Sequence, residues 1–228
     1  MSDIVPELID KVNEDFEERI DTARVKALRD KMVKGTATYD DAYKYAELIG
    51  KARSAALQGN MDLLPDDTMY YNIADRLMND SLTTDHELVA EYAKSAQELS
   101  NKKAGISLKA LSADLDEDRI RGFINGLCGE LGLPIETVLW KLGEPIITHA
   151  MSVVDDTIKK NADFQGKAGV RAVVIRKADP RCCAWCSQLA GTYEYPGVPR
   201  EVFMRHDNCR CTVDYEGKRL TGFQRNFR

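Results

Sequence analysis

Hydrophobic residues in the first 165 positions recur at helical spacing, with charged residues between them. Near the N-terminus they form one stripe, with intervals of mostly three or four residues, that predicts a long amphipathic helix. The stripe consists of Leu8, Val12, Phe16, Ile20, Val25 and Leu28. Thr38, followed by acids at positions 40 and 41, has the pattern of a helix N-cap with negative charge in the first turn. It predicts a second helix, which should end near Gly59.

Two further helices are predicted between residues 65 and 103. Pro65 and the two acids after it are typical of a helix start and should begin the third helix. Thr84 and Glu87 have the spacing of a capping box, which predicts that a fourth helix begins there and ends near Lys103.

The helical pattern is weakest at residues 105–114, which we interpret as a link. Helical periodicity returns at residues 116–128 and 134–142. Glu144-Pro145 then introduces a run through Ile158, in which the proline is expected either to kink the helix or to restart it.

From Gly166 onward the pattern changes from helical to alternating. Residues 170–175 are short and β-branched, and residues 191–195 and 211–215 alternate between apolar and polar positions. Three short strands are therefore predicted.

We thus expect an α+β protein, with a mostly helical N-terminal two-thirds and a small antiparallel β module near the C-terminus. The predicted parts are a helical region (1–105), a second helical part (106–165) and the β module with a basic tail (166–228).

Composition is consistent with a folded globular protein. The chain has 228 residues, of which 43% are hydrophobic and 30% charged, so it can bury at least one core, and disorder is not expected. No run approaches 18 apolar residues, so no membrane association is predicted.

The net charge of −5 is unevenly distributed along the chain, because residues 166–228 carry 12 Lys+Arg against 6 Asp+Glu. This basic end could face an acidic protein surface or nucleic acid, although such an excess is ordinarily a solvated face.

Two clusters of potential metal ligands lie within thirty residues of each other near the C-terminus. Cys183 and Cys186 form a C-x2-C pair, and a second group containing His206, Cys209 and Cys211 begins about twenty residues later. One tight turn can present the two sulfurs of the first pair, and the second group can complete a tetrahedron around one ion. The spacing therefore predicts a zinc site.

Three other uses of these cysteines fit the sequence less well than zinc. Disulfides are disfavoured, because the first eleven residues carry acids and a proline in place of a secretory leader, which predicts a reducing compartment. A thioredoxin-like redox pair would need a βαβ context and no second cluster. A cysteine nucleophile with His206 as its base would not need four cysteines grouped in twos.

Which side chains would bind the ion is left open by the spacing. The candidates for about four positions are Cys182, Cys183, Cys186, His206, Cys209 and Cys211. We prefer the four sulfurs of Cys183, Cys186, Cys209 and Cys211, with His206 as the best substitute. Four protein ligands leave no open position, so the zinc is expected to be structural and to hold together three strands that bury too little on their own.

The C-terminal half resembles the minor head proteins of tailed bacteriophages, the family of the phage Mu head-morphogenesis protein. The resemblance rests on three motifs and on the helical lead-in at residues 154–169, and it covers about residues 130–216. The motifs are Cys183-Ala-Trp-Cys186, Leu189-Ala-Gly191 and His206-Asp-Asn-Cys-Arg-Cys211. The first 105 residues carry no motif that matches the family.

This resemblance implies a minor capsid protein of the phage head, associated with the portal or the head interior. It implies a role in head assembly, DNA packaging or DNA ejection, with several copies per particle. The portal and the major capsid protein would be its partners, with phage DNA as a further candidate. Its location would be the virion, and the host cytoplasm during assembly.

Two alternative functions are a nucleic-acid-binding zinc protein and an enzyme. A nucleic-acid-binding zinc protein is suggested by basic residues around the clusters. These are Arg171, Arg176, Lys177, Arg181, Arg205 and Arg210. An enzyme is not expected, because the chain has no Gly-rich phosphate loop, serine elbow or H-E-x-x-H helix.

Overall fold

A computed structural model of the chain describes residues 3–218 and confirms the predicted α+β class. The helices of this part of the chain are α1 (Val5–Ile20), α2 (Ala23–Val33), α3 (Tyr39–Gly59), α4 (Tyr71–Ala104), α5 (Glu117–Cys128), α6 (Ile135–Val138), α7 (Glu144–Lys167) and α8 (Ala184–Gln188). Short 3-10 helices are η1 (Met61–Leu63), η2 (Pro65–Asp67), η3 (Leu139–Leu142) and η4 (Arg200–Phe203). The strands are β1 (Thr68–Met69), β2 (Leu133–Pro134), β3 (Arg171–Lys177), β4 (Gly191–Glu194) and β5 (Thr212–Lys218). The predicted basic tail lies mostly outside the described residues.

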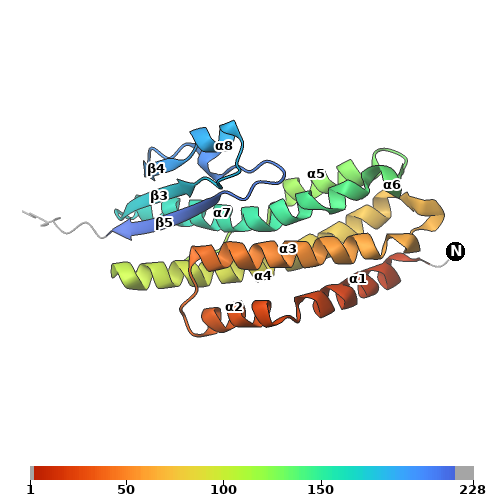
Figure 1. Cartoon of the computed structure of the whole chain (residues 1–228), viewed down its shortest axis with the longest axis horizontal. Helices are drawn as coiled ribbons and strands as arrows, with labels where there is room; N and C mark the ends of the chain where they lie inside the picture. Colours follow the sequence, from red (N-terminus) through yellow and green to blue (C-terminus); the bar gives the residue numbers. More distant parts are fainter. Residues whose placement is uncertain (1–2, 219–228) are drawn as a thin grey trace, which may run out of the picture.

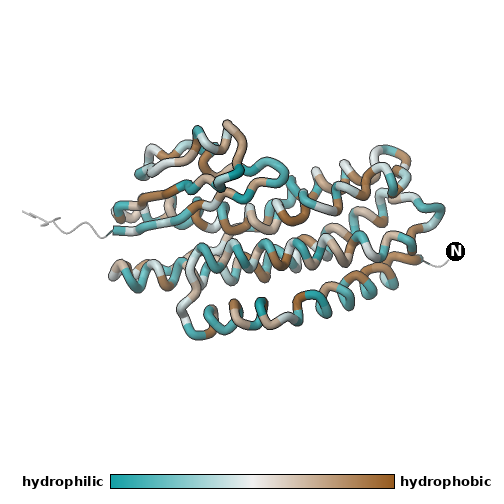
Figure 2. The backbone as a smooth tube through the Cα atoms, in the orientation of Figure 1, coloured by the Kyte–Doolittle hydropathy of each residue, from teal (hydrophilic) through white to brown (hydrophobic). Residues whose placement is uncertain are grey.

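The long helices run side by side in layers, which gives the molecule an elongated shape (Figure 1). Helices α1 and α2 cover one side of α3 and α4, whereas α7 packs against the other side of the same pair. The small sheet lies beside the C-terminal part of α7 and also contacts α3 and α4, and α8 lies on its outer side (Figure 1). Hydrophobic and hydrophilic positions alternate along each helix, as the periodicity predicted (Figure 2). None of the described helices is long and apolar enough to cross a membrane.

The first predicted helix is wrong in one respect, because it is broken into α1 and α2. Thr22 has extended backbone angles, and its hydroxyl accepts a hydrogen bond from the backbone N–H of Val25 at 3.3 Å. It therefore caps a new helix, although the apolar stripe continues through the break.

The predicted boundary at Thr84 is also wrong, since α4 is one continuous helix of 34 residues. The Thr84 hydroxyl donates to the carbonyl of Asp80 at 3.0 Å, a bond typical of threonine inside a helix. The helix begins at Tyr71, because Pro65 starts only a 3-10 turn.

Thr38 caps α3 as predicted, and its hydroxyl and the Asp41 carboxylate form a complete capping box. Helix α7 runs unkinked from Glu144, because Pro145 lies in the first turn, where a missing N–H costs nothing.

The weakly helical link at residues 105–114 has no regular structure and lies along α7. The Asn161 side chain accepts from the N–H of Leu111 at 2.9 Å and donates to its carbonyl at 2.6 Å. The Thr157 hydroxyl accepts from the N–H of Ala113 at 3.1 Å. Side chains of α7 thus replace the backbone partners that this link lacks.

The three-stranded sheet has the order β4-β3-β5 with antiparallel pairing. Val174 of β3 pairs with Tyr215 of β5, and both are buried in the same hydrophobic core as the long helices. The sheet therefore obtains its core by packing on α7, α4 and α3. One hydrophobic core includes residues on both sides of positions 105 and 165. The division of the chain into three parts at these positions therefore stays a prediction.

Candidate metal centre

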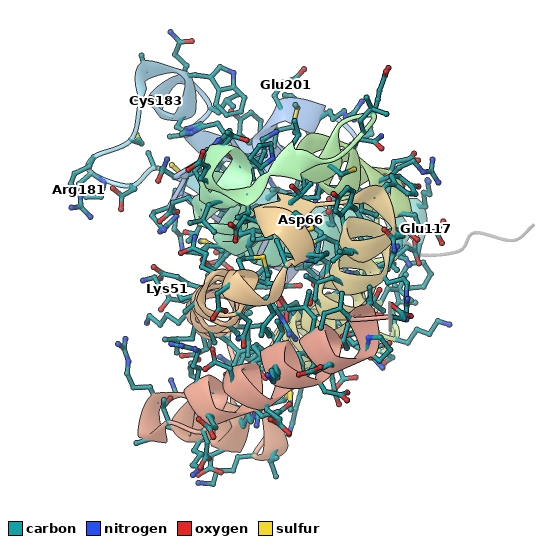
Figure 3. All side chains as sticks on the ribbon, turned by 90° about the vertical axis from the view of Figure 1, so that its right-hand side faces the viewer. Lys51, Asp66, Glu117, Arg181, Cys183 and Glu201 are labelled. Carbon is teal, nitrogen blue, oxygen red and sulfur yellow. The ribbon has the colours of Figure 1, made fainter. Side chains whose placement is uncertain are left out.

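The C-x2-C pair is presented by the short helix α8. Cys183 occupies the N-cap position with extended backbone angles, and Cys186 lies in the first turn. Their side chains meet on one side of this turn, with Cys183 exposed and Cys186 buried. Cys183 lies on α8 at the outer side of the molecule (Figure 3).

The second cluster depends on a tight turn between His206 and Cys209. The N–H of Cys209 donates to the carbonyl of His206 at 3.2 Å, and Asn208 has a φ of 62°. This left-handed conformation is unfavourable for most side chains but is tolerated by asparagine. Asn208 therefore allows the imidazole and the Cys209 sulfur to approach α8 together.

The donor atoms of the five predicted ligands come together in two groups of three. Cys183, Cys186 and His206 form one, and Cys186, Cys209 and Cys211 form the other, with all ligand atoms of a group within 4.8 Å of one another. His206 Nε2 lies 3.3 Å from Cys183 Sγ and 3.2 Å from Cys186 Sγ. Cys186 Sγ lies 3.7 Å from Cys209 Sγ. The buried Cys186 is thus common to both groups.

His206 is oriented for metal binding by its other nitrogen. Nδ1 lies 2.7 Å from the carbonyl of Asp207, so the hydrogen-bond pattern assigns the proton to Nδ1. The lone pair of Nε2 then faces the two sulfurs, as in histidine ligands whose second nitrogen donates to a carbonyl. The Trp185 ring contacts the imidazole edge-on at a centroid distance of 5.9 Å.

Cys211 and Cys182 lie at the other side of the cluster. The N–H of Asp179 donates to Cys211 Sγ at 3.4 Å. Burial and the neighbouring Cys211 raise the pKa of Cys182. Cys211 precedes β5, so its approach to Cys209 comes from the loop and not from a strand.

The pKa values of the two thiols in the C-x2-C pair shift in opposite directions. Burial raises the pKa of Cys186 to about 12, and the guanidinium of Arg176 opposes that rise. Backbone N–H donors at the start of α8 lower the pKa of Cys183, the first of them from Cys186.

Two arginines attach the cluster to the helical body. Arg205 forms a buried ion pair with Asp155 of α7, and Asp155 also accepts from the Tyr43 hydroxyl at 2.6 Å. Arg210, between two of the cysteines, lies 2.8 Å from Glu144 of α7 and 3.4 Å from Glu47 of α3. The cluster therefore has fixed contacts with two long helices.

Arg176 and Arg205 are among the basic residues that suggest nucleic-acid binding in the sequence, whereas both side chains are buried in the structure. A signal for Arg176 was present, because it follows Ala172 and Val174 at alternate positions of β3 and so shares their inward face. Cys128 lies outside the cluster as a small core residue, and its thiol donates to the carbonyl of Ile124 at 3.0 Å.

No family model matched this chain, and no match was found among curated proteins or solved structures. Its function is therefore inferred from the site and from the motifs. The Cys/His cluster could hold a metal ion.

Proposed function

We propose that this cluster holds one structural zinc ion with four protein ligands. The observation that carries the proposal is the convergence of four cysteine sulfurs and the Nε2 atom of His206, in two overlapping groups, from two separate segments. Thiolate and imidazole are the ligands that zinc prefers, and four of them leave no coordination position for a substrate. We therefore infer a stabilising role for the ion and no reaction at it.

The separations between these atoms support zinc. In a tetrahedral site, zinc–ligand bond lengths place two sulfurs about 3.8 Å apart and a sulfur and a nitrogen about 3.5 Å apart. The Cys186–Cys209 sulfur pair at 3.7 Å and the two sulfur–nitrogen pairs at 3.2 and 3.3 Å are close to these values.

Metal analysis of the purified protein tests this assignment. We expect one zinc per chain in the wild type, and loss of zinc in Cys186→Ser and Cys209→Ser. Cys128→Ser is the matched control, because Cys128 is equally buried but lies in α5, outside the cluster. A wild-type protein without zinc, purified without chelators, would refute the assignment.

We further propose that the chain is a minor head protein of a tailed phage that contacts the portal or the major capsid protein. The motif resemblance supports this role, as do the ion pairs that attach the cluster to an elongated helical body (Figure 1). Large exposed apolar side chains, which are common at protein contacts, are found in the segments around the β1–β2 pair. They are Tyr71, Leu131 and Trp140, with exposed fractions of 53%, 90% and 60%.

The assembly role can be tested in purified proheads and virions. Mass spectrometry should find the chain in at least one of them, and its absence from both would sink the proposal. Leu131→Lys with Trp140→Lys should reduce incorporation. Val33→Lys is the control, because Val33 is 82% exposed but lies on α2.

The alternative, a nucleic-acid-binding zinc protein, receives less support from the basic side chains. Arg171 and Lys177 form ion pairs with acids on the neighbouring strands, and Arg205 and Arg210 pair with acids of the helices. Only Arg181, among the six residues considered, has a largely free side chain, and it lies at the outer margin of the molecule (Figure 3). Binding to DNA at low salt that weakens steeply as salt rises would favour this alternative.

A further inference from the structure

Arg176 is a buried cation that faces the cysteine cluster. Its side chain extends from β3, and the residue is only 2% exposed. One terminal nitrogen, Nη1, donates to the carbonyl of Val202. The other, Nη2, lies 3.6 Å from Cys186 Sγ and 4.0 Å from Cys209 Sγ.

Within residues 3–218, no carboxylate forms an ion pair with this guanidinium. Two other arginines with buried side chains differ, because Arg53 is paired with Asp85 and Arg205 with Asp155. An unpaired buried charge costs several kcal/mol, so an anionic partner is expected close to Arg176. The two sulfurs in contact with Nη2 are groups that can become anionic.

The charge of the loaded site depends on its ligands. Zinc with four thiolates carries a charge of −2, whereas zinc with three thiolates and a neutral imidazole carries −1. The single charge of Arg176 neutralises only the second combination. Arg205 cannot supply another positive charge, because Asp155 already neutralises it.

The geometry also favours an imidazole ligand. His206 Nε2 lies within 3.3 Å of two sulfurs, and its Nδ1 is held by a carbonyl. For the remaining position, Cys211 also lies within 4.8 Å of Cys186 and Cys209, but Cys209 is the sulfur at 3.7 Å from Cys186 Sγ and 4.0 Å from Arg176 Nη2. The geometry therefore favours Cys209 over Cys211.

We propose that Arg176 is a positioning residue that neutralises the metal site, and that it thereby selects Cys183, Cys186, Cys209 and His206 as the ligands and leaves Cys211 outside. This inference rests on the proposed zinc site and specifies its ligand set. It departs from the all-cysteine set that the spacing favours.

The Arg176→Met variant of the full-length protein tests whether the positive charge of Arg176 supports zinc binding. Zinc affinity is measured by competition with a chromophoric chelator. We expect the affinity to fall by about tenfold or more, as for other residues that support a metal site through its ligands. Arg176→Lys, which keeps the charge, should recover most of the loss. Arg171→Met is the control, because Arg171 lies on the same strand but is exposed and paired with Glu194. Equal affinity of Arg176→Met and wild type would overturn the role of Arg176.

The ligand set is tested separately, with Co²⁺ as a spectroscopic probe. Cys211→Ser should keep the wild-type thiolate-to-cobalt absorption and bind one metal ion, whereas His206→Ala should change the spectrum and weaken binding. The opposite pattern would overturn the selection of His206, even if an Arg176 variant failed to fold. A wild-type chain that binds neither zinc nor cobalt would instead refute the zinc site itself.

Discussion

His149 is a buried histidine of α7 whose two ring nitrogens have no hydrogen-bond partner among the described residues. It lies beside a cavity of about 180 Å³ that is also lined by Arg119 and Phe123. Burial lowers its pKa to about 3, and the nearby Arg119 acts in the same direction. The ring is therefore neutral in the folded protein at neutral pH.

This burial should make the protein sensitive to acid. Between about pH 6.5 and pH 3 the unfolded chain binds a proton at His149 that the folded chain does not, so stability falls as pH decreases. The slope is at most about 1.4 kcal/mol per pH unit from this group. His149→Leu should reduce that slope in urea unfolding experiments between pH 4 and 6.5, and an unchanged slope would contradict the prediction.

Asp85 should have the opposite effect on stability. Burial raises its pKa to about 7, although Arg53 lies 3.0 Å away and lowers it. Between about pH 4 and 7 the folded chain binds a proton that the unfolded chain does not, so stability from this group falls as pH rises. Asp85→Asn should remove this dependence and make the remaining acid sensitivity steeper. Urea unfolding of both single variants and of the double variant separates the two contributions and measures any coupling between the sites.

At the scale of elements, the backbones of α3 and α7 come close together at Gly50. A Cβ atom built there would lie 2.7 Å from the Cα of Ile147, nearer than real Cβ contacts allow. Glycine thus lets the two helix backbones approach each other.

Gly50→Ala should therefore separate α3 from α7 and destabilise the protein by about 1–3 kcal/mol. Gly122→Ala is the matched control, because Gly122 is also inside a helix but a Cβ atom added to it would meet no neighbouring group within 4 Å. That control should be neutral or stabilise by about 0.5–1 kcal/mol. Thermal or urea unfolding of the two variants measures the difference, and equal effects would show that the close approach is unimportant.

The sequence predicted those elements whose signals are local. The Thr38 cap was predicted correctly, because its partner Asp41 is three residues away. The same type of signal failed at Thr84, where burial of neighbouring residues against other helices keeps α4 continuous. Thr22 was missed for the opposite reason, because the apolar stripe passes through the break without interruption.

The candidate site was only partly predictable in the same way. The spacing of the cysteines and His206 predicts that the C-x2-C pair and the second cluster lie together, and in the structure they do. Two contacts of the site could not be predicted in this way. Arg176 contacts the sulfurs because of the sheet register, and Arg205 contacts Asp155 because of the way the turn packs on α7. Contacts over such sequence distances leave no local pattern.

At the scale of the whole molecule, the metal and the helices should stabilise different parts of the β region. The inner face of the sheet packs on the helices through Val174 and Tyr215, whereas α8 and the His206 turn are joined mainly through the cluster. Loss of the metal should therefore loosen α8 and the His206 turn more than the inner face of the sheet.

Removal of zinc with a chelator should show this difference by hydrogen exchange. Amides at residues 182–190 and 204–211 should exchange faster by about tenfold or more, while those of α3 and α4 keep their protection. The metal-free Cys128→Ser variant should behave in the same way as the metal-free wild type. Simultaneous loss of protection throughout the helices would contradict this division.

The Cys209-Arg210-Cys211 segment places neighbouring side chains in two different environments, since both cysteines face the cluster while the arginine between them reaches Glu144 and Glu47. A residue that looks like a spacer in the motif is therefore part of an interhelical contact. The cluster consequently depends on the helices that it contacts and cannot be transferred by its motif alone. Grafting it onto another scaffold would require matching acids on the receiving helices, and a relative that keeps the cysteines but loses those acids should attach its cluster in a different orientation.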